Sequence, residues 1–233
     1  MSSGTLLLEV IVQSVADARA AADGGADRLE VVRDILQGGL TPLLSVVRAI
    51  AAETSLPLRV MVRGNAGYEM APDELQALRR AAEAFTAAGV DGLVIGFARA
   101  GEAALEDVER VLEAAPGVRV TFHRAFDALR DPLGTIPALT SLQNIDHILT
   151  SGGDGSAQDR CERLTEYVRL AGPGIAIIAG GGVDEEALTL FARQGCVREV
   201  HVGRTARDGG DADGPVSAAR VRQLKALTNT ART

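Results

Sequence analysis

Histidine and glutamate residues lie near the ends of short apolar segments in this 233-residue sequence. His123 ends the alternating stretch VRVTFH (118–123), and Glu30 and His201 lie in two similar stretches. Side chains of these types exchange protons near neutral pH when burial or neighbouring charges shift their pKa values. The three residues therefore indicate a site for acid–base chemistry. The alternative is that each is a hydrogen-bonded core residue.

Glycines and arginines at other segment ends indicate a site for an anion. Three glycines follow one apolar segment in IIAGGGV (177–183), a Gly-Arg pair follows the next in VHVGRTAR (200–207), and Arg63 ends a third. Glycine lets backbone N–H groups approach a phosphate closely, and arginine adds positive charge. The alternative is that these glycines serve only tight turns. The expected anion-binding residues are Gly181, Gly182, Gly203 and Arg204.

Eight short apolar segments alternate with eight amphipathic ones, which predicts a (β/α)₈ TIM-type barrel, an α/β fold of parallel strands. An open doubly wound sheet is the alternative, but no Gly-x-Gly-x-x-Gly follows the first predicted strand. No linker divides the chain, so we expect one domain over residues 1–233. The predicted strands are 6–13, 27–32, 58–63, 91–96, 118–123, 145–150, 174–179 and 198–203. The predicted helices are 15–23, 42–53, 73–88, 104–114, 132–142, 157–171, 184–193 and 217–228.

In many predicted strands, polar or charged residues occupy every second position, and apolar residues occupy the positions between them. In a closed barrel alternate residues point into the lumen, so this pattern predicts a polar interior. Because an isolated buried charge is costly, we expect structural ion pairs deep in the barrel. The residues expected in these pairs are Glu9, Arg28, Arg59 and Glu199. One connected network is expected to join Glu9, Arg28, Glu30, Arg63 and His123.

In barrel enzymes the active site lies at the carboxyl ends of the strands. Polar residues at those ends are therefore the better candidates for a functional role. Arg63 and His123 end their strands, so we expect both at the mouth of the barrel. Arg124 is expected to point toward the helices or a neighbouring loop, and His147 to be a core or wall histidine. The expected catalytic set, with acid–base and charge-stabilising roles, is Glu30, Arg63, His123, Glu9 and His201.

The composition argues against several other functions. The formal net charge is −7 without a basic run, so nucleic acid is not an expected partner. No apolar run approaches the roughly 20 residues of a membrane helix, and the first residues do not resemble a signal peptide, so we expect a cytoplasmic protein. Lys225 is the only lysine and lies at no strand end, which argues against a Schiff-base aldolase. Cys161 and Cys196 lie in unrelated contexts and predict no disulfide framework.

Ordered motifs along nearly the whole chain resemble those of one family. They are GGADRLEV (24–31), GGLTP (38–42), VTFHRAFDAL (120–129), LTSGG (149–153), AGGGV (179–183) and EVHVGR (199–204). On these motifs the sequence resembles the CutC family, known as copper homeostasis proteins. The resemblance implies a TIM-type barrel, a cytoplasmic setting, a homodimer or higher homo-oligomer, and a role in handling Cu(I).

The sequence departs from the family where copper ligands are expected. Some members carry cysteines proposed to bind Cu(I) at the positions of Ile11 and Val32, and Cu(I) prefers such soft ligands. The predicted lumen holds no cysteine and one methionine, Met61. Three functions stay open: copper handling, an enzyme (lyase, isomerase or hydrolase) acting on a small anionic or phosphorylated metabolite, and a site for a harder metal. The harder metal would be held by Glu30, His123 and His201.

Overall fold

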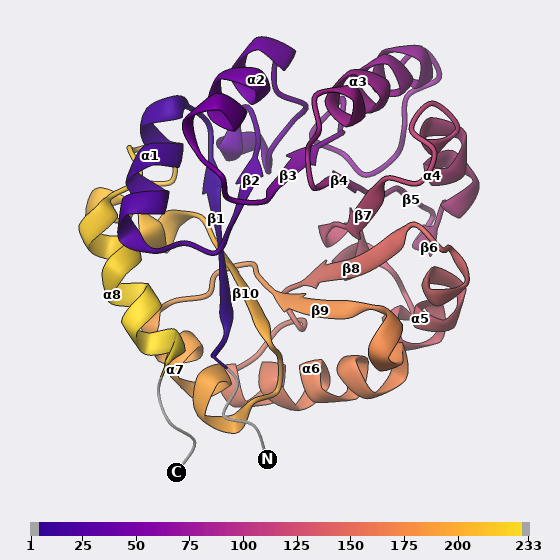
Figure 1. Ribbon diagram of the computed structural model, residues 1–233. Helices are drawn as coiled ribbons and strands as arrows, with labels where there is room; N and C mark the ends of the chain where they lie inside the picture. Colours follow the sequence, from indigo (N-terminus) through magenta and orange to yellow (C-terminus); the bar gives the residue numbers. More distant parts are fainter. Residues whose placement is uncertain (1–4, 230–233) are drawn as a thin grey trace.

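Eight parallel strands close into a barrel, and α-helices surround it (Figure 1). The structure, a computed structural model, describes residues 5–229. The strand order around the barrel is β1-β10-β9-β8-β7-β4-β3-β2, which confirms the predicted (β/α)₈ fold. The predicted domain range also includes residues 1–4 and 230–233, which lie outside the described residues.

The elements coincide with the predicted segments, and most strands are one or two residues shorter at their ends. The barrel strands are β1 (Leu7–Val12), β2 (Arg28–Val31), β3 (Leu58–Met61), β4 (Gly92–Ile95), β7 (Arg119–Phe122), β8 (Ile145–Thr150), β9 (Ala176–Ala179) and β10 (Glu199–Val202). The helices are α1 (Val15–Gly24), α2 (Leu44–Glu53), α3 (Leu75–Ala87), α4 (Leu105–Leu112), α5 (Pro132–Ser141), α6 (Ala157–Ala171), α7 (Glu185–Gln194) and α8 (Ala218–Thr228). A small antiparallel ladder, β5 (Ala98–Arg99) and β6 (Glu102–Ala103), was not predicted.

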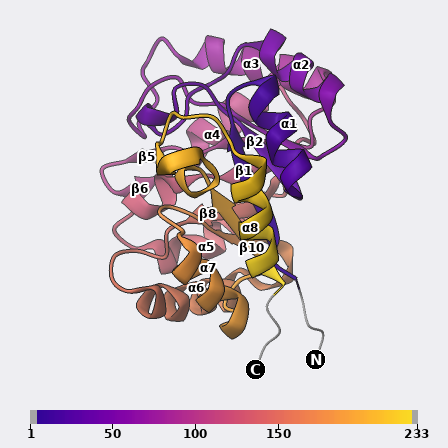
Figure 2. The same cartoon turned by 90° about the vertical axis from the view of Figure 1, so that its left-hand side faces the viewer.

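The apolar parity of the strands faces the helices, as the alternation predicts. Leu8, Val10 and Val12 of β1 are fully buried in the main hydrophobic cluster. The last helix, α8, packs against α1 and so completes the ring around the barrel (Figure 2). Within residues 5–229, no helix combines the length and the apolar character needed to cross a membrane.

Side-chain caps and glycines set several helix ends. Ser14 caps α1 by accepting a hydrogen bond from the N–H of Asp17, and Asp184 caps α7 by accepting one from Ala187. Gly25 and Gly195 end these two helices in the left-handed conformation, with φ of 91° and 65°. Because an L side chain strains that conformation, glycine suits both positions.

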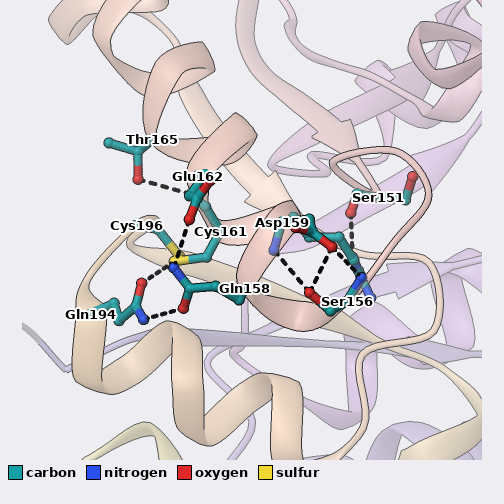
Figure 3. Close-up of a disulfide and its surroundings, with 10 residues drawn as sticks. Ser151, Ser156, Gln158, Asp159, Cys161, Glu162, Thr165, Gln194 and Cys196 are labelled. Atoms are coloured by element: carbon teal, nitrogen blue, oxygen red, sulfur yellow. Dashed lines mark hydrogen bonds between the residues drawn. A yellow bond between two sulfur atoms is a disulfide. The ribbon is translucent and has the colours of Figure 1, made fainter.

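The two cysteines form a disulfide, which corrects the expectation that they are unrelated (Figure 3). Cys161 lies in the first turns of α6, and Cys196 lies in the loop before β10. Their Cα atoms are 5.5 Å apart although 35 residues separate them in sequence. The barrel brings the start of α6 beside the end of α7, a neighbourhood that cysteine spacing does not reveal.

Candidate functional site

A pocket of about 660 Å³ opens where the strands end at the carboxyl face of the barrel. This volume suits a small molecule. Strand ends far apart in sequence supply its walls, as the barrel fold requires. The sequence-predicted residues that line it are Glu30, Arg63, His123, Gly181, Gly182, His201, Gly203 and Arg204. Glu9 is buried beside His201 and does not line the pocket.

One group of buried ion pairs centres on Arg28. Parallel register places Glu9 of β1 opposite both Arg28 of β2 and His201 of β10. Arg28 donates hydrogen bonds to Glu9 and to Oε2 of Glu199, the latter at 2.6 Å. His147 Nε2 lies 3.3 Å from both Glu199 Oε1 and Arg28 Nη1, so His147 is a partnered core residue, as predicted. This geometry confirms the structural ion pairs expected deep in the barrel.

A second group of ion pairs centres on Arg59, which is 1% exposed. Its Nη atoms donate to both carboxylate oxygens of Asp146 at 2.8 and 2.7 Å, and its Nε donates to Asp91 at 2.8 Å. Such bidentate pairing satisfies a buried guanidinium. The sequence predicted a partner for Arg59, and the structure identifies the two aspartates.

His201 lies between two buried glutamates. Its Nδ1 is 2.7 Å from Oε1 of Glu9, and its Nε2 is 3.6 Å from Oε2 of Glu30. Burial lowers the pKa of His201, but the two carboxylates outweigh burial and raise the pKa above its ordinary value. Burial likewise opposes ionisation of Glu9, yet Arg28 and His201 hold its pKa well below the usual range. Glu9 therefore stays anionic and orients the His201 ring.

Glu30 has the pKa that an acid–base group needs. Burial, with a further contribution from the Glu9 charge, raises the pKa of Glu30 to about 7, although His201 and Arg28 act in the opposite direction. Its Oε1 atom is buried and, within the described part of the chain, has no hydrogen-bond partner. A carboxyl group in this state can donate or accept a proton at neutral pH.

His123 presents a neutral hydrogen-bond donor to the pocket. Its Nδ1 accepts a hydrogen bond of 3.1 Å from the N–H of Ala125, so the proton of the neutral ring is on Nε2. Burial, reinforced by the charge of Arg63, lowers the pKa of His123 to about 3. Nε2 has no partner among residues 5–229, and the side chain is 2% exposed. At neutral pH His123 can therefore donate a hydrogen bond but cannot supply a positive charge.

The Arg63 side chain holds two loops together and is not part of the Glu9–Arg28 network. This corrects the expectation of one network that includes Arg63 and His123. Its guanidinium donates to the carbonyl oxygens of Gly38, Ala66 and Gly67, with distances of 3.2 Å to Gly38 and Gly67. It also lies 4.8 Å from the ring centroid of Tyr68, in a cation–π contact. Arg63 thus ties the loops after β2 and β3 together at the pocket. No hydrogen bond or ion pair of the described residues joins Arg63 or His123 to the Glu9–Arg28 network.

The glycine loop after β9 leaves two backbone N–H groups beside the pocket without a protein acceptor among residues 5–229. Arg160 of α6 donates to the carbonyl oxygens of Gly180 and Gly181 at 2.9 and 3.2 Å. The N–H and C=O of a trans peptide point in opposite directions, so the amides of Gly181 and Gly182 point away from Arg160. Neither amide donates to another protein group in the described range, and both residues line the pocket. Sequence reasoning missed Arg160, whose position within a helix carries no local signal of this role.

Two further arginines lie at the pocket. Arg204 follows β10 and lines the pocket, at the barrel mouth where it was expected, and its side chain is exposed. Arg124 also lines the pocket, which corrects the expectation that it points away. Its Nε donates to Asp127 at 2.8 Å, and its side chain is about half exposed. Arg124 begins a 3-10 helix, η2 (Arg124–Ala128), and this turn breaks the strand alternation from which its direction was predicted.

Apolar side chains form another part of the pocket. Ile11, Val32 and Met61 line it and belong to a small apolar cluster of their own, separate from the main core. Ile11 and Val32 stand where the resemblance implied copper-binding cysteines. Within residues 5–229, no group of three or more His, Cys, Asp or Glu side chains is arranged to hold a metal ion, and Glu30, His123 and His201 do not form such a group.

Comparison with known proteins agrees with this architecture. The CutC family model matches residues 6–206. The chain belongs to the CutC family. It is 36% identical to a family protein CutC of Caulobacter vibrioides, over 97% of this chain and 90% of that protein. It is 31% identical to the human copper homeostasis protein cutC homolog, over 88% of this chain and 76% of that protein.

A CutC structure also shares the fold. The putative copper homeostasis protein CutC of Streptococcus agalactiae superposes with a TM-score of 0.76 at 24% identity, covering 84% of this chain and 97% of that chain. The matched residues 6–206 include all eight barrel strands and the residues Gly181, Gly182, Gly203 and Arg204, whereas α8 lies beyond them. The motifs on which the resemblance was based therefore lie inside the matched region.

Proposed function

We propose that this CutC-family protein is an enzyme that binds a small phosphorylated metabolite at the barrel mouth and moves a proton with Glu30. One observation carries the proposal. Glu30 Oε1 and His123 Nε2 are buried on the same pocket, and neither has a partner within the described residues. Because an unpaired buried polar atom is costly, such a pair is explained best by a ligand that completes both groups.

The phosphate would bind at the loops after β9 and β10. The unpaired amides of Gly181 and Gly182 supply hydrogen bonds, and Arg204 supplies positive charge. Loops at these positions commonly hold phosphate in barrel enzymes. Arg160 binds the carbonyl oxygens of Gly180 and Gly181, and this keeps those oxygens turned away from the anion.

The chemistry that fits these groups is proton abstraction next to a carbonyl, leading to isomerisation or to cleavage. The Glu30 carboxylate removes a proton from carbon, and the electron pair of the broken C–H bond moves to the carbonyl oxygen. The neutral Nε2–H of His123 donates a hydrogen bond to that oxygen as charge develops on it. Where the carbon that loses the proton carries a hydroxyl group, the hydroxyl proton passes to the former carbonyl oxygen and Glu30 returns its proton to the former carbonyl carbon. The carbonyl group thereby moves by one carbon, which completes an isomerisation. Glu9 and His201 act as positioning residues that set the proton affinity of Glu30.

The pocket does not fit Cu(I), the metal that the family's name implies. Cu(I) prefers thiolate and thioether ligands, and Met61 is the one sulfur-bearing residue among those that line the pocket. The two cysteines are joined to each other in a disulfide at α6 and the loop before β10. No step of the proposed chemistry therefore passes through copper.

Two measurements test the proposal. A thermal-shift screen of phosphorylated metabolites should identify a stabilising class, and that class should then be turned over. Glu30→Gln should keep binding and lower turnover by about 10²- to 10⁴-fold, the usual contribution of a general acid–base. Glu53→Gln, which alters a carboxylate on the outside of the barrel, serves as control and should leave turnover unchanged. Copper bound at about one ion per purified chain, without a response to any phosphorylated compound, would contradict the proposal.

A further inference from the structure

The pocket has two chemically different sides. Ile11, Val32 and Met61, from β1 to β3, provide an apolar wall. The loops after β7, β9 and β10 provide hydrogen-bond donors and positive charge. The donors are His123, Arg124, Gly181, Gly182 and Arg204.

The apolar wall is not part of the barrel's main core. Val32 and Met61 point into the lumen at 2% and 3% exposure and pack with Val94, while Ile11 and Ile35 are only partly buried against them. Their strands carry charged residues at the neighbouring lumen positions, Glu9, Glu30 and Arg59. An apolar surface at the open end of the barrel, above these charged positions, provides a place for an apolar part of a ligand.

The apolar wall and the anion loops meet at Gly203. A Cβ atom built on this residue would lie 2.9 Å from Cδ1 of Ile11, which is closer than side chains normally approach. Glycine at this position therefore lets the Ile11 side chain reach the loop that carries Arg204. An anion held by that loop would have its substituent directed along Ile11 and Val32.

We propose that the ligand is an amphipathic phosphomonoester, with a short apolar body on the Ile11–Val32–Met61 wall and its phosphate at the Gly181–Gly182 and Arg204 loops. This inference rests on the proposed function and specifies the substrate class of the same site. It excludes polyhydroxylated sugar phosphates, whose hydroxyl groups would lose water against the apolar wall without gaining partners there.

The test compares two phosphate esters of equal heavy-atom number, n-pentyl phosphate and glycerol 3-phosphate, by titration calorimetry. Each buried methylene is worth about a fourfold gain in affinity, so n-pentyl phosphate should bind about tenfold more tightly or better. Val32→Thr, which keeps the side-chain shape, should reduce this ratio by about threefold or more. Ile11→Ser provides a second variant with the same expected direction. Thermal unfolding of each variant establishes that it is folded.

Arg204→Gln is the matched control, because it alters the anion side only. It should weaken binding of both esters by similar factors and leave their ratio unchanged. If glycerol 3-phosphate binds as tightly as n-pentyl phosphate, the amphipathic class is wrong and the phosphate site stands. If neither ester nor inorganic phosphate binds, the proposed function itself is overturned, and this inference with it.

Discussion

His201 and Glu30 form a buried pair at the pocket, with 3.6 Å between His201 Nε2 and Glu30 Oε2. The other ring nitrogen of His201 is held by Glu9 at 2.7 Å. Two carboxylates thus compete for one imidazole, and only Glu9 is also paired with Arg28. Glu9 consequently keeps its charge, and Glu30 is the carboxyl group whose pKa is raised.

Glu30→Gln should change how stability depends on pH. The folded-state pKa of Glu30 is raised to about 7 from an ordinary value of 4.5, so the folded state binds the extra proton between these pH values. The wild-type protein therefore loses stability as pH rises from about 4.5 to 7, by up to about 3 kcal/mol from this group. Gln resembles the protonated form and should not show this loss. Urea unfolding of both proteins across this pH range measures the difference. If wild type became more stable relative to Glu30→Gln as pH rises, the raised pKa of Glu30 would be contradicted.

Arg160→Gln should weaken phosphate binding through the glycine loop. The change removes the hydrogen bonds to the Gly180 and Gly181 carbonyl oxygens, so the loop amides lose their orientation. We expect inorganic phosphate to bind about tenfold more weakly, comparable to one hydrogen bond to a charged group. Arg163→Gln is the control, since Arg163 lies on the same helix but bonds the Gly152 and Asp154 carbonyl oxygens. Equal losses in both variants would show that α6 acts through stability alone.

Arg28→Met should destabilise the barrel strongly. The substitution leaves Glu9 and Glu199 buried without their guanidinium partner, which costs about 3–5 kcal/mol. Arg19→Met removes an exposed pair with Glu53, which solvent screens, and should lower stability far less than Arg28→Met. Chemical denaturation of the two variants measures both values. If Arg28→Met hardly changed the free energy of unfolding, this would indicate that water reaches Glu9 and Glu199 inside the barrel.

Cys161→Ser should lower stability without changing the pocket. The disulfide closes a loop of 35 residues, and losing such a cross-link costs about 2–4 kcal/mol. Reduction of the wild-type protein should give a similar decrease, and phosphate affinity should be unchanged in both cases. Disulfides are rare in reducing compartments, so thiol labelling without reductant also reports on the protein's surroundings. Two reactive thiols in the native protein as isolated would contradict the bond.

Ile11→Cys combined with Val32→Cys should create a Cu(I) site. Both positions lie in one cluster with Met61, so two thiolates and a thioether would converge there. Competition with a Cu(I) chelator should detect about one ion per double variant and none bound by the wild-type pocket. The Ile11→Ala and Val32→Ala double variant controls for the change in packing. Equal Cu(I) binding by wild type and the cysteine variant would contradict the copper argument.

The sequence by itself determined the elements and the direction of their side chains. Period-2 alternation in β1 and β10 predicted that Glu9 and His201 share the lumen, and register then placed them side by side. The same rule placed Arg63 and His123 at the mouth, because side-chain direction along a strand depends only on local geometry. The glycine loops could be predicted for a similar reason, since they directly follow strands.

Only the tertiary structure decided which groups satisfy one another. Arg160 donates to the glycine loop from a helix, and Arg63 donates to three loop carbonyl oxygens. Cys161 forms a disulfide with Cys196, which lies 35 residues away in sequence. Arg124 turns to the pocket because a 3-10 helix replaces the strand after His123. Periodicity states which way a side chain points, but hydrogen bonds and pKa values depend on the distances between elements. Those distances arise only when the barrel closes and brings β1 beside β10.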